Sequence, residues 1–473
     1  MSEAGIYGLT PLLSSLVGLL LVPIYTRAFA PADYGAIALV NTSTTFASIL
    51  VVFGLDNSSA IWFWDKPDPT ERKRTFSTWL AYTLLTSLVL GLGAVALQRP
   101  LSRWLFQDES FWPLWPLFAA NLVALNVPRI GIMWYRMQRS PWPAVLLGAV
   151  SSVGTAAFGI LFVVGMRLGV PGVIGGQAVG SWLGAVIALA ALRHVFSTRA
   201  VDTKRLGPML RLSAPLVLMT QLSWVMGSAV SYVVNFLCSR DDAGLYQLAA
   251  SLSSLLGLVM FAFQQAWAPF ALSIRDVPTA RRVYGVTVEA SFVVGLVLAF
   301  AAAVFAKPAL LIIARPEYVR SEGVLAILAL NTALANIPAV ISVTFAREKA
   351  TMPLAKATAG GAIVTVALLP LLASGFGKIG AAVSVVVGTT TILVLTFVAS
   401  QRTFPIQVQL GRIAFAVTVV VAALVTFFVS KPAVASLGLM LAHAALLVAS
   451  LMAAVGWLYR KPLASAWRDS RAS

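Results

Sequence analysis

One arginine stands inside a long apolar stretch of the sequence, where an ionised side chain needs a reason. Arg129 follows Pro128 in the apolar run 113–135, and inserting a charge there costs at least about 2.5–3.5 kcal/mol. A guanidinium can hold two phosphate oxygens at once, so Arg129 is a candidate anion-binding residue. The alternative is that its long side chain extends to water at the nearby end of the run. Asn126 lies one helical turn earlier on the same face and is a second candidate.

Other polar candidates end apolar runs or lie inside them. Arg27 ends the first run, where it either steers an anionic ligand or complements a helix dipole. Arg347 ends the tenth run and Asp56 the second, and the alternative for Arg347 is ordinary loop charge. Buried amides suit sugar hydroxyls but also link helices, so both interpretations stay open for Asn336, Gln264 and Gln265.

The elements that position these residues have to cross a membrane. Of the 473 residues, 59% are hydrophobic and only 11% are charged, whereas soluble domains carry about 25% charged residues. A span needs about 20 apolar residues, and only helices or closed barrels satisfy their backbone in lipid. Fourteen helical spans are predicted, at 5–29, 35–56, 76–98, 113–135, 144–166, 173–193, 213–237, 246–273, 286–306, 323–345, 357–375, 380–399, 413–430 and 437–459.

The net charge of +17 indicates membrane topology rather than nucleic-acid binding. Lys and Arg stand in short loops, more than twice as many on the side of the N-terminus as on the other. The positive-inside rule then predicts both termini in the cytoplasm and an inner-membrane location. The single cysteine, Cys238, excludes an intramolecular disulfide, and the two histidines lie far from other ligands, so we expect neither a metal nor a cofactor.

The chain repeats itself at a nearly fixed offset. Segments 121–128 and 331–338 share the pattern Asn-x4-Asn-x-Pro at an offset of 210 residues, and three further motifs match at 208 or 209. Each copy holds six spans, an even number, so both enter the membrane in the same direction, as in parallel-repeat transporters. The sequence predicts an all-α integral membrane protein with two six-helix bundles related by a pseudo-two-fold axis, 1–205 and 206–400, and a two-helix appendix with a tail, 401–473.

Three motifs now point to a family. Leu-Val-Pro-Ile-Tyr-Thr-Arg-Ala-Phe at 21–29, Asp-Tyr-Gly at 33–35 and Gln-Gln-Ala-Trp-Ala-Pro-Phe at 264–270 resemble bacterial polysaccharide-export flippases of the multidrug, oligosaccharidyl-lipid and polysaccharide flippase superfamily. The resemblance implies alternating-access flipping of an undecaprenyl-diphosphate-linked oligosaccharide, a polysaccharide or lipopolysaccharide precursor. Arg129 would then bind the diphosphate and Arg27 would steer or release it. Expected partners are this substrate, membrane lipids and polysaccharide polymerases or glycosyltransferases, with the chain itself a monomer.

Three other functions stay open. Cation-coupled drug exporters of the same superfamily use carboxylates in spans one, seven or ten, where this chain has none. Lipid II flippases carry an Arg-Asp pair where Leu21 and Val22 stand. A membrane polymerase or glycosyltransferase would need paired acids in a loop-built site, and the outer loops are short. The chain has no phosphate-binding glycine loop for ATP, so we expect a transporter rather than an enzyme.

Overall fold

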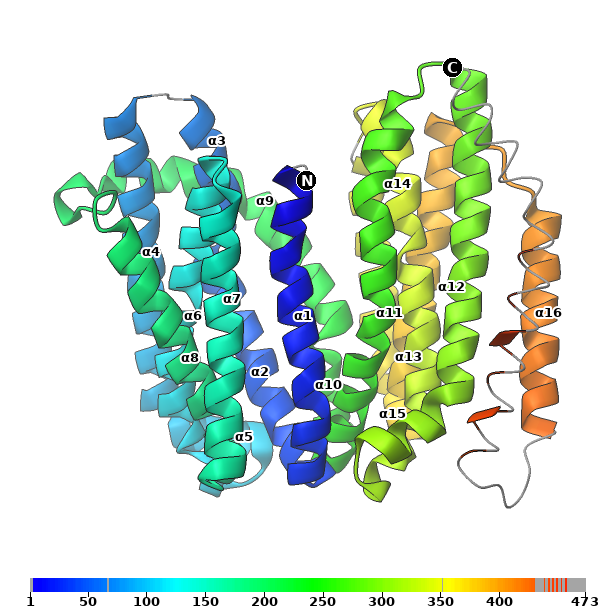
Figure 1. Ribbon diagram of the computed structural model, residues 1–473, viewed down its shortest axis with the longest axis horizontal. Coiled ribbons are helices and arrows are strands. Elements are labelled where there is room, and N and C mark those ends of the chain that lie inside the picture. Colours follow the sequence, from blue (N-terminus) through cyan, green and yellow to red (C-terminus); the bar gives the residue numbers. More distant parts are fainter. Residues whose placement is uncertain are drawn as a thin grey trace. The chain divides into compact units, whose positions relative to one another are not determined.

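The computed structural model describes residues 3–65, 68–350 and 352–429, with scattered residues beyond, and every regular element in that part of the chain is helical (Figure 1). The predicted all-α fold is therefore confirmed. The chain divides into two compact units, Met1–Trp224 and Val225–Ser473. The domain boundaries predicted from the repeat stay a prediction, and most of the fourteenth predicted span lies outside the described residues.

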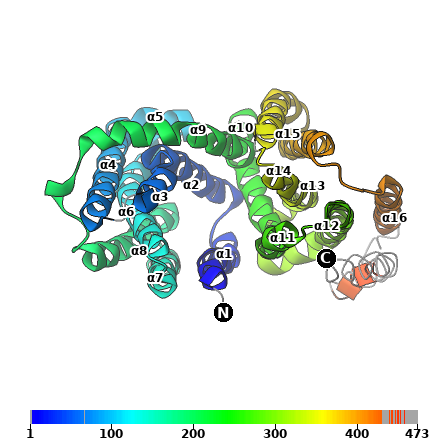
Figure 2. The same cartoon turned by 90° about the horizontal axis from the view of Figure 1, so that it is seen from above.

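The first unit is built from nine helices in the described part of the chain, the last of which runs on into the second unit. Their bounds are α1 (Glu3–Ala28), α2 (Pro31–Val52), α3 (Leu55–Asp65), α4 (Pro69–Ala96), α5 (Gln98–Phe106), α6 (Leu114–Met137), α7 (Pro141–Ile160, continued by the π-helix Leu161–Gly165), α8 (Gly169–Leu192) and α9 (Thr203–Gly227), with 3-10 turns at Glu109–Phe111 and Thr198–Ala200. Figure 2 looks along these helices and shows α6 among α2, α4, α7 and α8.

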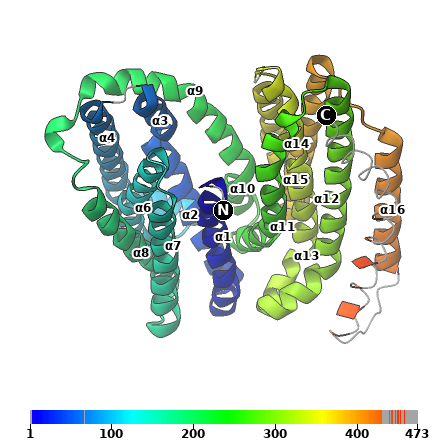
Figure 3. The ribbon, with the colours of Figure 1, turned by 45° about the horizontal axis from the view of Figure 1, so that its top comes forward.

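The second unit repeats this arrangement around another central helix. Its elements are α10 (Val230–Leu237), α11 (Arg240–Ser273), α12 (Val277–Ile313), a 3-10 turn (Pro316–Ser321), α13 (Glu322–Ala335), α14 (Ile337–Arg347), α15 (Met352–Thr403) and α16 (Leu410–Val429). Within this unit α13 packs against α11, α12 and α15 (Figure 3). The first copy of the Asn-x4-Asn-x-Pro motif lies within the central helix α6, and the second copy runs from the end of the central helix α13 into the start of α14.

Length and hydropathy identify most helices as membrane spans. Nine of the helices in the described ranges are long and apolar enough to cross a bilayer, and Trp224–Leu237 and Leu410–Val425 are shorter apolar helices. Helix α15 contains two predicted spans, and its backbone leaves the helical conformation between them at Gly377, where φ is 59°. Glycine adopts this left-handed value without steric cost, so it can join two consecutive spans.

A sharp bend separates α2 from α3 and sets the direction in which α3 begins. Phe53 and Gly54 both have positive φ, 45° and 66°. The Ser213 hydroxyl of α9 donates to the Gly54 carbonyl at 3.0 Å. A Cβ added to Gly54 would lie 3.2 Å from Cβ of Ser213, so the small residue also permits close packing. Because the bend ends α2 at Val52, Asp56 lies in the first turn of α3 instead of at the end of the second span, where the sequence predicted it.

Helices α7 and α8 touch backbone to backbone. A Cβ added to Gly176 would lie 2.5 Å from Cα of Gly159, and one added to Gly180 would lie 2.2 Å from the Thr155 nitrogen. Small residues spaced by four let membrane helices approach this closely, which replaces the hydrophobic drive that lipid does not supply. The contact fixes α7, which carries several of the polar side chains described below.

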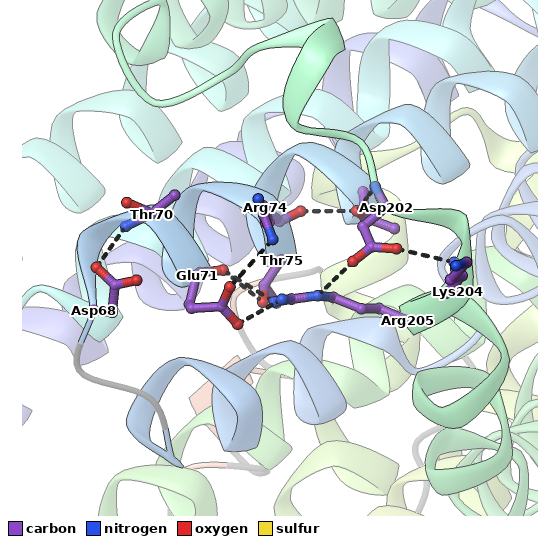
Figure 4. A network of polar contacts seen from close by, with 9 residues as sticks. Asp68, Thr70, Glu71, Arg74, Thr75, Asp202, Lys204 and Arg205 are labelled. Atoms are coloured by element: carbon purple, nitrogen blue, oxygen red, sulfur yellow. Dashed lines mark hydrogen bonds and ion pairs between the residues drawn. The ribbon is translucent and has the colours of Figure 1, made fainter.

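Ion pairs and hydrogen bonds link the segment that leads into α9 to the start of α4 (Figure 4). Arg205 is 12% exposed; its Nη2 donates to Glu71 at 2.5 Å and its Nε donates to Asp202 at 2.9 Å. The Asp202 backbone N–H donates to the Thr78 hydroxyl at 2.8 Å. The pKa of the Asp202 carboxyl is lowered, first because Arg205 donates a hydrogen bond to it.

This pKa shift predicts how the link between the segment before α9 and the start of α4 depends on pH. A carboxyl whose pKa falls on folding stabilises the folded arrangement above its ordinary pKa, about 3.9, and loses this contribution as the pH falls through the folded value. We therefore expect amides 197–205 to be protected from deuterium exchange at neutral pH and to lose this protection, measured against the intrinsic exchange rate at each pH, in strong acid. Asp202→Asn is expected to lose the protection already at neutral pH, and Lys204→Gln, whose side chain is exposed, serves as control. Equal exchange in both variants would contradict this role of Asp202.

In the second unit a buried carboxylate holds the connection to α16. Glu289 of α12 is fully buried, and its Oε1 accepts from the Gln409 N–H at 2.6 Å. Its Oε2 lies 3.4 Å from Nη1 of Arg412. The Gln407 N–H donates to the Arg281 carbonyl at 3.1 Å. A Cβ added to Gly285 would meet the Gln407 carbonyl oxygen at 1.9 Å, so only glycine lets the connection lie this close to α12.

Candidate binding cavity

Asn126 anchors the central helix of the first unit. Its side chain is fully buried, and its Oδ1 accepts from the Ser48 hydroxyl of α2 at 2.7 Å while its Nδ2 donates to the Leu122 carbonyl at 3.0 Å. Helix α6 continues through Pro128 without interruption. The contacts of Asn126 therefore link α6 to α2, and a role in substrate binding stays a prediction.

Arg129 and Asp56, 73 positions apart in the chain, form an ion pair. Nη2 of Arg129 lies 3.0 Å from Oδ2 of Asp56, and the Asp56 Oδ1 also accepts from the Asn57 N–H. The Arg129 side chain is 52% exposed and that of Asp56 is 22% exposed. Two charged candidates of the sequence analysis thus meet, with the guanidinium still accessible to a ligand.

The pair borders a cavity of about 540 Å³ within the first unit. Its walls come from α1, α3, α6, α7 and α8. Among the described residues of the lining, the charged side chains are those of Arg129, Arg136 and Asp56, and the other polar side chains are hydroxyls. These are Thr10, Ser14, Ser151, Ser152, Thr155 and Ser181. Such a site combines cationic groups for an anion with neutral groups for sugar hydroxyls.

The sequence analysis did not predict the hydroxyl side chains that line this cavity. The available signal was the spacing of Thr10 and Ser14, one helical turn apart, and the grouping of Ser151, Ser152 and Thr155 on the fifth span. The hydroxyls of the polar run 43–45 in the second span do not contribute to this cavity, and they donate to carbonyls of their own helix.

Three of the six cavity hydroxyls donate their protons to acceptors of the protein. Ser151 donates to the Leu147 carbonyl at 2.9 Å, and Thr155 donates to the Ser152 carbonyl at 2.8 Å. Ser181 donates to Oδ1 of Asn121 at 2.9 Å. The hydroxyls of Ser14 and Ser152 share a hydrogen bond of 2.7 Å between α1 and α7. The oxygens of the donating hydroxyls keep lone pairs that can accept further hydrogen bonds.

Two candidates of the second unit also meet. Gln264 of α11 donates through Nε2 to Oδ1 of Asn336 at 2.7 Å, and Nδ2 of Asn336 donates to the Thr332 carbonyl at 2.6 Å. Asn336 stands at the break between α13 and α14, whereas its repeat equivalent Asn126 lies within a continuous helix. The Gln265 side chain lies outside the described part of the structure.

The two remaining candidates lie at helix ends. Arg27 is exposed in the last turn of α1. Arg347 donates through Nη1 to the Ile274 carbonyl at 2.8 Å and through Nη2 to the Arg275 carbonyl at 3.1 Å, so it binds the backbone that follows α11. Neither lines the cavity around Arg129, and substrate binding by them stays a prediction. Within the described ranges no three His, Cys, Asp or Glu side chains are grouped as metal ligands.

Comparison with known proteins identifies the family. Residues 2–274 match the family model described as "Polysaccharide biosynthesis protein". The chain belongs to this family. The resemblance inferred from the motifs at 21–29, 33–35 and 264–270 is thereby confirmed. No curated protein sequence matches the chain.

Solved structures share the fold at low sequence identity. The lipid II flippase MurJ in an inward closed conformation superposes with a TM-score of 0.77 at 13% identity, covering 97% of this chain and 99% of MurJ. An inward-facing multidrug resistance MATE transporter of the MOP superfamily gives 0.69 at 14% identity, covering 85% and 94%. The MATE transporter VcmN of Vibrio cholerae, in its bent form, gives 0.55 at 16% identity, covering 85% and 97%. This member of the polysaccharide biosynthesis family is thus a multi-pass membrane protein with the fold of these transporters.

Proposed function

We propose that this protein flips an undecaprenyl-diphosphate-linked oligosaccharide, a precursor of polysaccharide or lipopolysaccharide, from the inner to the outer leaflet of the cytoplasmic membrane. The observation that carries the proposal is the cavity around Arg129, where two guanidiniums and six hydroxyl side chains line about 540 Å³ inside a membrane-spanning bundle. The hydroxyl groups suit the sugar and the guanidiniums suit the diphosphate. Family membership and the fold support a polysaccharide precursor as cargo.

The Asp56–Arg129 pair gives the cavity a way to bind and release the diphosphate. In the empty cavity the carboxylate neutralises the guanidinium, which lowers the cost of burying that charge. A diphosphate carries more negative charge than one carboxylate and displaces Asp56 from the guanidinium. Because Asp56 then competes for the same site, the substrate is bound reversibly, as alternating access requires. Arg27, in the last turn of α1, steers the diphosphate at the outer side in this proposal.

The surroundings of the protein follow from the same proposal. The excess of Lys and Arg on one side predicts cytoplasmic termini. Enzymes that assemble the lipid-linked oligosaccharide supply the substrate on that side, and a polymerase or glycosyltransferase consumes it outside. The chain acts as a monomer in this proposal, because each step is assigned to side chains of one copy.

The test is leaflet transfer of a labelled undecaprenyl-diphosphate oligosaccharide in proteoliposomes. The wild-type protein is expected to accelerate transfer, and Arg129→Gln to slow it about tenfold or more, because hydrogen bonds to charged groups contribute about 1.5–3 kcal/mol. The matched control is Arg103→Gln, since Arg103 is also an exposed arginine paired with a carboxylate, Glu109, but outside the cavity. It is expected to keep full transfer.

The outcome separates this proposal from the main alternative. Full transfer by Arg129→Gln would exclude diphosphate binding at this cavity. No transfer of any lipid-linked sugar by the wild-type protein, together with ion-driven efflux of a small organic cation, would identify a cation-coupled exporter instead. In that case Asp56 is the carboxylate to test, because it is the acid that lines the cavity in the described part of the chain.

A further inference from the structure

A second cavity lies in the first unit and shares no lining residue with the one around Arg129, as far as the described residues show. It has a volume of about 690 Å³ and is bounded by the end of α3, the start of α4 and the ends of α6 and α8. The walls combine aromatic rings with basic side chains. The lining side chains used below are Phe63, Trp64, Trp134, Arg72, Lys73 and Arg139.

The charged side chains that line this second cavity are all basic. Arg72, Lys73 and Arg139 line it together with His194, and none of the described carboxylates belongs to the lining. The acids at the start of α4 face elsewhere: Asp68 caps the helix by accepting from the Thr70 N–H, and Glu71 accepts from Arg205 (Figure 4). The first turns of α4 thus keep their acids on one face and present cations to the cavity from another.

Contacts with the aromatic wall hold the cations in place. The Arg72 Nε donates to the Phe63 carbonyl at 3.1 Å, and its guanidinium lies 4.2 Å from the centre of the Phe63 ring. Arg139 follows α6 with a φ of 53°, and its guanidinium lies 5.7 Å from the Trp64 ring. These contacts leave guanidinium N–H groups that can bind an anion.

The aromatic wall offers one accessible ring on a fixed support. Phe63 and Trp134 are 4% and 5% exposed and pack edge to face at 5.5 Å. Trp64 packs edge to face on Phe63 at 5.5 Å and is 54% exposed. An accessible indole beside cations suits a ring that carries a phosphate, because the ring can stack while the cations hold the phosphate.

We propose that this second cavity is a separate binding site for a phosphate-bearing sugar headgroup, with the phosphate held by Lys73 and Arg139 and the sugar stacked on Trp64. Loop charges at the inner membrane face also follow from topology alone, but topology requires neither a concave wall nor a shared aromatic support. The choice of the lipid-linked oligosaccharide as the source of this headgroup rests on the proposed function, whereas the phosphate chemistry does not. In that role the second cavity is where the headgroup first docks on the protein.

The test measures binding to the full-length protein in nanodiscs of neutral phosphatidylcholine, with a short-chain prenyl-diphosphate disaccharide as probe. Lys73→Gln/Arg139→Gln is expected to weaken binding about tenfold or more in the Arg129→Gln background, where the first cavity is disabled. The matched control, Arg193→Gln/Lys204→Gln, also removes two exposed positive charges outside the second cavity and is expected to change binding less than about twofold. Equal weakening in both double variants would overturn the proposal.

Two further arms identify the ligand. Trp64→Leu is expected to weaken binding of the disaccharide probe but not of a bare prenyl diphosphate, and an equal loss for both would overturn the stacking. Phosphatidylglycerol added to the nanodiscs, or soluble uridine diphosphate glucose, is expected to compete poorly. Effective competition by either would overturn the assignment to lipid-linked sugar and give that competitor as the source. Intact probe binding without leaflet transfer would instead contradict the proposed function alone.

Discussion

Gly176→Ala is expected to lower the melting temperature of the purified protein by about 5 °C or more, whereas Gly175→Ala next to it is expected to leave it nearly unchanged. A Cβ on Gly176 would stand 2.5 Å from Cα of Gly159, so α7 and α8 have to separate. Forcing atoms into such a contact costs about 1–3 kcal/mol or more, which corresponds to several degrees in a domain of this size. A Cβ on Gly175 would have its nearest neighbour, Phe162, at 3.6 Å, an ordinary contact.

The same variant is expected to slow leaflet transfer, because α7 carries Ser151, Ser152 and Thr155 of the cavity wall. Thermal unfolding in detergent, followed by size-exclusion chromatography after heating, measures the first effect. The two glycines are neighbours on one helix, so their variants share expression, detergent and helix propensity. Equal melting temperatures for the two variants would show that α7 and α8 do not meet through their backbones at Gly176.

Arg412→Met is expected to destabilise the second unit by about 2–4 kcal/mol. The substitution leaves the carboxylate of Glu289, which is fully buried, without its cation, and breaking a buried pair from one side costs about 3–5 kcal/mol. The expected value is smaller because the Arg412 side chain is 31% exposed and solvent screens the pair.

A double-mutant cycle isolates this interaction. Glu289→Gln/Arg412→Met is expected to recover most of the lost stability, since a glutamine carbonyl still accepts from the Gln409 N–H and carries no charge. Arg103→Met, which breaks the exposed pair with Glu109, serves as control and is expected to cost less than about 1 kcal/mol. A double variant that is less stable than Arg412→Met alone would refute the role of the pair.

The sequence predicted the helices well because a bilayer imposes a length that apolar runs make visible. It predicted the C-terminal end of α2 poorly, because the bend there places Phe53, a non-glycine residue, in a left-handed conformation, and the Gly54 carbonyl next to it accepts from Ser213 of a distant helix. The shared Asn-x4-Asn-x-Pro motif likewise marked both central helices. It did not indicate that the helix is continuous at Asn126 and interrupted at Asn336.

The sequence predicted two of the charged residues of the cavity but neither their pairing nor the hydroxyl groups around them. Arg129 and Asp56 each stood out as a charge in or beside a span, but their pairing joins positions that no local pattern connects. The hydroxyls of α1 and α7 are individually ordinary in membrane helices, and only the packing of the two helices places Ser14 beside Ser152. The backbone contacts of Arg347 were not predicted, because the carbonyls that it binds, of Ile274 and Arg275, follow a helix distant in the sequence.

The direction of the hydrogen bonds in the Arg129 cavity has a consequence for selectivity. Ser151, Thr155 and Ser181 have given their protons to groups of the protein, so toward a ligand they are acceptors. A polyol supplies the missing donors along its whole length, whereas a polyether or a fully O-methylated glycan of the same size supplies none and leaves these oxygens desolvated and unmatched. In the proposed function we therefore expect Ser151, Thr155 and Ser181 to favour a ligand rich in hydroxyl groups without recognising any one sugar.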